Sequence, residues 1–269
     1  MEDNMFRLVN KNNLSYYVID SFEETGLVKH CFTTREGGVS RDEFSSLNLR
    51  FNCDDKRENV LKNYKIICDA IGVDYKNLVI SKQVHEDNIC RVTSADCGNG
   101  ITKENRFTSA DGLICSEPGV PIATLYADCV PLYFLDVKNR IIAESHSGWK
   151  GTVKNISSKT VEKMVNDYNS KPENILAAIG PSIGECHFEV GDEVAEEFLR
   201  LPYGSVKKYG EKYHVNLQET IEKQLLSAGI SKKNLTVAGI CTYCSSDLLF
   251  SHRKTKGKRG NMAAIMELV

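Results

Sequence analysis

The sequence predicts an α+β fold, a mixed α/β arrangement of short strands with a few amphipathic helices. Short apolar runs rich in β-branched residues and bounded by turn residues recur along all 269 residues. Helical periodicity is confined to four segments. Several strands also follow one another directly, four of them between Asp111 and Ser145, which disfavours a doubly wound parallel sheet.

Nine runs of four to seven residues have the length, β-branched content and flanking turn residues of strands. In chain order they are Val28–Thr34, Leu78–Ser81, Asp111–Cys115, Ile122–Ala127, Leu132–Asp136, Arg140–Ser145, Ile175–Ile179, Leu235–Ile240 and Met262–Leu268.

The helices are predicted from a stripe of apolar residues with a period near 3.6. Lys56–Ile71 places Val60, Tyr64 and Ile67 on one face, and Gly72 is a typical helix end. The other three segments are Thr152–Tyr168, Glu193–Leu201 and Leu217–Ala228, the last closed by Gly229.

The chain is expected to form one domain over residues 1–269. This length is at the upper end of what one core supports, and the sequence contains no long linker, repeat or low-complexity tract. A net charge of -2 argues against nucleic acid or an anionic membrane as a partner. The basic run Arg253–Arg259 is therefore predicted to be a solvated loop. The sequence predicts no oligomeric state.

The cellular compartment is predicted to be the cytoplasm. The start Met1-Glu2-Asp3-Asn4 is acidic where a signal peptide is basic, and no apolar run is long enough to span a membrane. The ten cysteines then belong to a reducing compartment, where thiols stay free or bind metal. Cys31, Cys68 and Cys115 lie in apolar runs and are expected to be buried.

Three segments place reactive side chains at strand ends or tight turns, where catalytic groups concentrate. They are Gln83–Glu86, Tyr126–Pro131 and His146–Gly151. Within the third, Gly-Trp-Lys-Gly opens a helix and presents backbone N–H groups to an anion. Taken singly, a His or Cys at a strand end is more often structural than a ligand.

Together the motifs resemble the YfiH-like family, in order along nearly the whole chain. This family has been labelled multicopper polyphenol oxidase (laccase) and is described as purine nucleoside phosphorylase. The motifs are Phe32-Thr33-Thr34-Arg35-Glu36-Gly37-Gly38-Val39-Ser40, Ser46-Leu47-Asn48-Leu49, Gln83-Val84-His85, Ala110-Asp111-Gly112, Ala127-Asp128-Cys129-Val130-Pro131, His146-Ser147-Gly148-Trp149-Lys150-Gly151, Ile179-Gly180-Pro181-Ser182-Ile183-Gly184 and Phe250-Ser251-His252-Arg253.

The resemblance implies a single-domain layered α/β/β/α fold and one metal ion bound by His85, Cys129 and His146. It implies phosphorolysis of adenosine, inosine and methylthioadenosine to the free base and ribose 1-phosphate, and deamination of adenosine. Purine nucleosides and phosphate are then the partners. The sequence departs from the family where Lys150 replaces the usual Arg and His187 a common Tyr.

Two imidazoles and one thiolate leave a fourth tetrahedral position open, which is typical of catalytic zinc, although copper also suits this donor set. Beside these three residues, Arg35 is predicted to be catalytic, because a guanidinium matches phosphate with two parallel hydrogen bonds. Substrate-binding or supporting roles are predicted for Asn48, Asp128 and Lys150. Lysine keeps the charge of the usual Arg but loses its bidentate geometry.

Three other functions stay open. A copper-binding, laccase-like polyphenol oxidase needs many imidazoles, whereas the chain has six histidines and no His-x-His pair. A metal-free cysteine hydrolase would use Cys129 as nucleophile, with His146 or His85 as base. The third is a hydrolase that edits peptidoglycan precursors.

Cysteines near the C-terminus form half of a zinc ribbon, Cys241-Thr242-Tyr243-Cys244. The sequence has no second Cys-x-x-Cys, so a structural zinc is not expected there. His187 beside Cys186 is a possible additional ligand.

Overall fold

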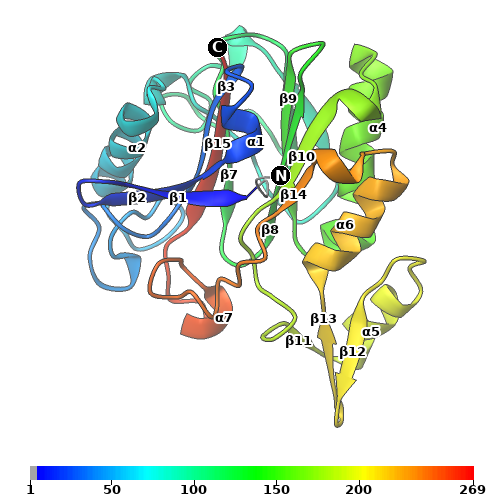
Figure 1. Ribbon diagram of the computed structural model, residues 1–269. Coiled ribbons are helices and arrows are strands. Elements are labelled where there is room, and N and C mark those ends of the chain that lie inside the picture. The colour runs from blue at the N-terminus through cyan, green and yellow to red at the C-terminus, as the bar shows by residue number, and fades with distance from the viewer. Residues whose placement is uncertain (1–4) are drawn as a thin grey trace.

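The structure, a computed structural model that describes residues 5–269, contains two six-stranded sheets and one three-stranded sheet (Figure 1). The acidic residues 1–4, on which the expected absence of a signal peptide rests, lie outside this range. The first sheet has the order β1-β2-β3-β15-β7-β4. Its strands are β1 Phe6–Lys11, β2 Leu14–Ile19, β3 Val28–Thr33, β15 Met262–Leu268, β7 Ile122–Tyr126 and β4 Val79–Ile80.

The second sheet has the order β14-β10-β8-β9-β6-β5, with antiparallel pairs at its centre and a parallel pair at each edge. Its strands are β14 Leu235–Val237, β10 Ile175–Ile179, β8 Val130–Asp136, β9 Ile141–Ser147, β6 Gly112–Cys115 and β5 Ile89–Val92. The helices are α1 Asp20–Glu23, α2 Arg57–Ile71, α3 Trp149–Val153, α4 Ile156–Tyr168, α5 Asp192–Leu199, α6 Leu217–Ser227 and α7 His252–Thr255.

The two sheets face each other, and helices cover their outer faces. Strand β8 carries apolar residues on both of its faces: Tyr133 and Leu135 belong to the core between the sheets, while Val130, Leu132 and Phe134 pack under α4 and α6. On the other side, α2 packs on the first sheet through a third core. The predicted mixed α/β fold and its α/β/β/α layering are confirmed (Figure 1).

The third sheet, β11-β13-β12, projects from the body together with α5 (Figure 1). Its strands are β11 Glu189–Val190, β12 Val206–Tyr209 and β13 Lys212–Val215. These strands were not predicted from the sequence, because their polar residues give no continuous apolar run. The strands are only two to four residues long.

The predicted elements agree with the structure in the interior and differ from it at the edges. The hairpin β1–β2 was missed; in β1, FRLVNK, the alternation of apolar and polar residues breaks at Leu8-Val9. The single helix predicted over Thr152–Tyr168 is two helices in the structure: its first two residues belong to the short α3, and Asn155, with φ 59°, separates α3 from α4. Among residues 5–269 no helix combines the length and apolar character needed to cross a membrane.

A buried carboxyl group between the sheets makes stability depend on pH. Glu144 on β9 is fully buried; its Oε2 accepts a hydrogen bond from the Thr124 hydroxyl at 2.9 Å, and its Oε1 has no partner. Burial raises the pKa of Glu144 well above its ordinary value, so the folded protein holds this proton after the unfolded chain has released it.

Stability from Glu144 is therefore fully present below the unfolded pKa, about 4.3, and is lost as pH rises towards the folded pKa. Glu144→Gln should remove this loss, which is at most about 1.4 kcal/mol per pH unit. Urea unfolding of both proteins from acidic to mildly alkaline pH measures the difference, with the exposed Glu24→Gln as control. Wild-type and Glu144→Gln stabilities that change in parallel with pH contradict the assignment.

Candidate active site

Three side chains with metal-binding atoms meet where the chain passes from the first sheet to the second. His85 lies on the connection from β4 to β5, and Cys129 on the connection from β7 to β8. His146 lies near the end of β9. Their ligand atoms all lie within 4.8 Å of one another, and Cys129 Sγ is 3.9 Å from His85 Nε2. The structure thus brings together three residues that are remote in sequence.

A buried carboxylate, Asp111, organises this cluster from the start of β6. Its Oδ1 lies 3.0 Å from His146 Nδ1, which leaves Nε2 of that ring to face the cluster. The same carboxylate accepts the backbone N–H groups of Val84, His85 and Glu86 at 2.9–3.1 Å. It therefore holds the turn in which His85 has φ 63°. A carboxylate behind a histidine ligand is a common feature of metal sites.

No role for Asp111 was predicted from the sequence. Its signal was its place in the motif Ala110-Asp111-Gly112, directly before a buried strand. It makes four hydrogen bonds to two ligand segments that are separated by about 60 residues in the sequence, so only the folded chain reveals its partners.

The cluster favours a thiolate beside a protonated imidazole when no metal is bound. Burial alone would raise the pKa of Cys129, but charge interactions and hydrogen bonds with His146 and His85 lower it to about 6. Burial alone would lower the pKa of His146, but Cys129 and Asp111 raise it to about 9. A thiolate formed at neutral pH is the state that a metal ion binds.

Gly148 lies directly against the cluster, where the absence of a side chain leaves room for His85 and Cys129. A Cβ atom at this position would lie 3.0 Å from the His85 ring and 3.1 Å from Cys129 Sγ. Those contacts are too close for an added methyl group without displacement of the two ligands. The glycine of the Gly-Trp turn is therefore required by the close approach of the backbone to the site.

The residues fit a transition metal. Two imidazoles and one thiolate are the borderline-soft donors that zinc and copper accept. In a tetrahedral zinc site the sulfur and nitrogen ligands lie about 3.6 Å apart, given bond lengths of about 2.3 and 2.0–2.1 Å. The 3.9 Å between Cys129 Sγ and His85 Nε2 is close to that value.

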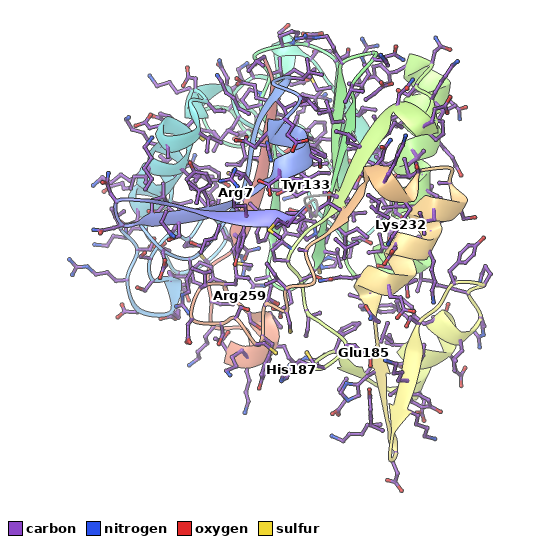
Figure 2. All side chains as sticks on the ribbon, in the orientation of Figure 1. Arg7, Tyr133, Glu185, His187, Lys232 and Arg259 are labelled. Atoms are coloured by element: carbon purple, nitrogen blue, oxygen red, sulfur yellow. The ribbon has the colours of Figure 1, made fainter. Side chains whose placement is uncertain are left out.

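The cluster opens into a pocket of about 750 Å³, within the usual range for small-molecule sites. Arg259, which is labelled in Figure 2, lines this pocket. It approaches Arg50 closely enough that their charges interact, and burial and that second cation lower the pKa of Arg259. The Nε of Arg259 is buried without a partner. Five cations line this pocket, and none takes part in an ion pair within residues 5–269; they are Arg50, Arg57, Lys82, Lys103 and Arg259.

The location of Arg259 corrects one prediction. The run Arg253–Arg259 was expected to be a solvated loop, and Lys254, Lys256 and Lys258 are indeed exposed. Arg259 turns inward because its guanidinium contacts the side chains of Asn261 and His252.

Arg35 does not line this pocket. Its Nε donates to the Ser45 carbonyl at 2.9 Å and its NH1 to the Ser246 carbonyl at 3.0 Å, and its guanidinium lies over the Phe250 ring. It lines a separate hollow beside Glu36. Its side chain holds two loops together.

Asn48 is fully buried and supports the pocket from behind. Its Oδ1 accepts the backbone N–H groups of Arg50 at 3.0 Å and Asn261 at 3.1 Å, and its Nδ2 donates to Asp55 at 2.9 Å. Arg50 and Asn261 both line the pocket. Asn48 thus positions the residues that a substrate would contact.

Asp128 and Lys150, for which substrate-binding or supporting roles are predicted, make different contacts. Asp128 accepts the Thr242 hydroxyl at 2.6 Å and the Arg253 backbone N–H at 2.8 Å. Lys150 is exposed, with its Nζ 5.6 Å from the centre of the Trp149 ring, and it does not line the pocket.

Fold and site together define a layered α/β/β/α protein with a candidate two-histidine, one-cysteine metal centre. The sequence family described as multi-copper polyphenol oxidoreductase laccase matches residues 29–269. The chain belongs to this family, whose members include the YfiH and YlmD proteins.

Relatives and solved structures cover almost the whole chain. The purine nucleoside phosphorylase YlmD of Bacillus subtilis is 34% identical over 240 residues, 87% of this chain and 86% of the relative. The purine nucleoside phosphorylase YfiH of Escherichia coli is 29% identical, over 95% of this chain and 100% of the relative. The crystal structure of the Bacillus licheniformis hypothetical protein YfiH matches with a TM-score of 0.91 and 33% identity, over 98% of this chain and 99% of that one.

Proposed function

We propose that the protein is a metal-dependent purine nucleoside phosphorylase that converts a purine nucleoside and phosphate to the free base and ribose 1-phosphate. The observation that carries this proposal is the convergence of His85, Cys129 and His146 on a pocket whose wall holds unpaired arginines. The names of the relatives support the same reaction.

In phosphorolysis a phosphate oxygen forms a bond to the anomeric carbon while the bond from that carbon to the purine nitrogen breaks. The departing base carries the electron pair and takes up a proton. Arg259 and Arg50 would bind the phosphate, since guanidinium groups match its oxygens and stay charged at all working pH values. We assign phosphate to this pair in place of Arg35, whose guanidinium is engaged by backbone carbonyls.

His85, Cys129 and His146 would hold the metal, which we propose to be zinc, with copper as an alternative. When bound, such an ion acts as a Lewis acid on an oxygen ligand. Asp111 would keep the His146 ring in the orientation that turns Nε2 to the ion. The same centre would serve phosphate-independent deamination of adenosine to inosine.

Purified, metal-loaded protein tests this function. Adenosine with phosphate should give adenine and ribose 1-phosphate, whereas adenosine without phosphate should give only inosine; inosine and methylthioadenosine should be cleaved only with phosphate. Product separation by liquid chromatography measures all three. Failure to convert any of these nucleosides would contradict the proposal and favour the editing of peptidoglycan precursors.

A metal-free cysteine hydrolase is the second candidate. The lowered pKa of Cys129 beside His146 favours it, because a thiolate at neutral pH is also a nucleophile. A chelator separates the two functions: it should abolish a metal-dependent activity, whereas it leaves a cysteine hydrolase active.

A further inference from the structure

A second group of metal-binding side chains lies outside the pocket. Cys186 and His187 come from the loop between β10 and β11, and Cys241 and Cys244 from the segment after β14. Their ligand atoms all lie within 4.8 Å of one another. Figure 2 shows His187 below α7, whereas Arg259 of the pocket lies above that helix.

The distances match a closed tetrahedral site. Zinc–sulfur bonds of about 2.3 Å place two thiolates about 3.8 Å apart and a thiolate and imidazole about 3.6 Å apart. Cys186 and Cys244 have their Sγ atoms 3.7 Å apart. Nδ1 of His187 lies 3.2, 4.0 and 3.4 Å from Sγ of Cys186, Cys241 and Cys244.

The surroundings hold these four groups in place. The two segments pair through Ser182, whose N–H donates to the Ile240 carbonyl and whose carbonyl accepts the Thr242 N–H. The Gly184 N–H donates to Cys241 Sγ at 3.2 Å. The His187 ring stacks on Tyr243 with centroids 3.8 Å apart.

Positive charge also lies beside the group. Arg253 donates from NH1 to the His187 carbonyl at 3.0 Å, and the Lys254 ammonium lies 4.5 Å from the centre of the Tyr243 ring. Three thiolates around a divalent ion leave a net negative charge, which these two cations would offset.

We propose that Cys186, His187, Cys241 and Cys244 bind a second metal ion, a structural zinc. Four protein ligands fill the tetrahedron and leave no open position, which distinguishes a structural from a catalytic zinc site. The Cys-x-x-Cys pair finds its partners in a Cys-His dipeptide 55 residues earlier in the chain, where no spacing rule indicates them.

The second site would support the first one. Thr242 and the backbone of Arg253, both adjacent to the second group of ligands, donate hydrogen bonds to Asp128. Asp128 directly precedes Cys129. A zinc that joins the two segments would therefore fix the loop that carries the thiolate of the first centre.

Metal analysis of protein purified with a reductant tests the proposal, with zinc as the only added metal. The wild type should carry about two zinc ions per chain, and Cys244→Ser and Cys129→Ser about one each. Cys97→Ser is the matched control, a half-buried cysteine outside both groups, and should keep about two. Unchanged stoichiometry in Cys244→Ser overturns the proposal, as does a Cys186–Cys244 disulfide seen in the intact mass of the wild type.

A titration of the metal-free wild type with Co²⁺ keeps the test valid if Cys244→Ser fails to fold. The second site supplies three thiolates, whereas the first site supplies a single thiolate. About three quarters of the sulfur-to-cobalt charge-transfer absorption should therefore come from the second site. Absorption at the level of a single thiolate overturns the proposal. Neither readout depends on nucleoside activity.

Discussion

Cys129→Ala is expected to abolish both phosphorolysis and deamination. The substitution removes one of three ligands and the only thiolate at the first centre, so the metal should be lost from that centre. A Lewis-acid metal contributes several kcal/mol to transition-state stabilisation, so kcat/KM should fall by roughly a thousandfold or more. Steady-state kinetics with phosphate and adenosine measure the loss, and elemental analysis measures the metal.

Cys97→Ala is the control for the loss of a thiol, because Cys97 lies away from the pocket. Its kinetics and metal content should match those of the wild type. Full phosphorolysis by Cys129→Ala, with the first centre empty, would show that the reaction does not use this metal. A wild type that keeps its activity in a chelator would instead support the cysteine hydrolase.

Arg259→Gln is expected to weaken phosphorolysis far more than deamination. A hydrogen bond to a charged group contributes about 1.5–3 kcal/mol, so kcat/KM for phosphate should fall roughly tenfold to a hundredfold. Deamination uses water in place of phosphate and should change much less. Initial rates over a range of phosphate concentrations, compared with inosine formation in phosphate-free buffer, measure the two effects separately.

Arg35→Gln provides the comparison for Arg259→Gln. Arg35 is half-buried, but it hydrogen-bonds to backbone carbonyls at a different hollow. Its replacement should reduce stability more than it changes the KM for phosphate. A selective loss of phosphorolysis in Arg35→Gln, with none in Arg259→Gln, would show that Arg35 binds the phosphate.

The interior of the fold could be predicted because burial leaves a strong pattern in the sequence. Strand β8 is buried along its whole length, and all its residues but Asp136 are apolar; β9 is buried too and begins with the apolar run Ile141-Ile142-Ala143. Strand β12 is exposed at three of its four residues and β13 is mostly half-buried, so neither gives such a pattern. The pattern of apolar residues continues across Asn155, but the backbone of this residue has a positive φ and ends the helix there. Hydrophobic periodicity contains no information on such a backbone conformation.

The same limit applies to the site. His85, Cys129 and His146 lie in recognisable motifs, whereas Arg259 was one cation among several in a basic run. Its role depends on a side-chain orientation set by Asn261 and His252. Cys241 and Cys244 lie beside Cys186 and His187 because two distant segments of the chain are hydrogen-bonded to each other. The spacing of cysteines in the sequence does not predict this contact.

The location of the first centre at the passages between the sheets links metal binding to folding. His85 and Cys129 approach each other only when both sheets are packed, because each lies on a segment that joins one sheet to the other. The unfolded chain has no such site, so a metal ion bound there would favour the native state and shift the unfolding equilibrium by mass action. Free metal at a thousand times its dissociation constant adds about 4.1 kcal/mol to the free energy of unfolding. By the same reciprocity, any change that separates the two sheets weakens the affinity for the metal.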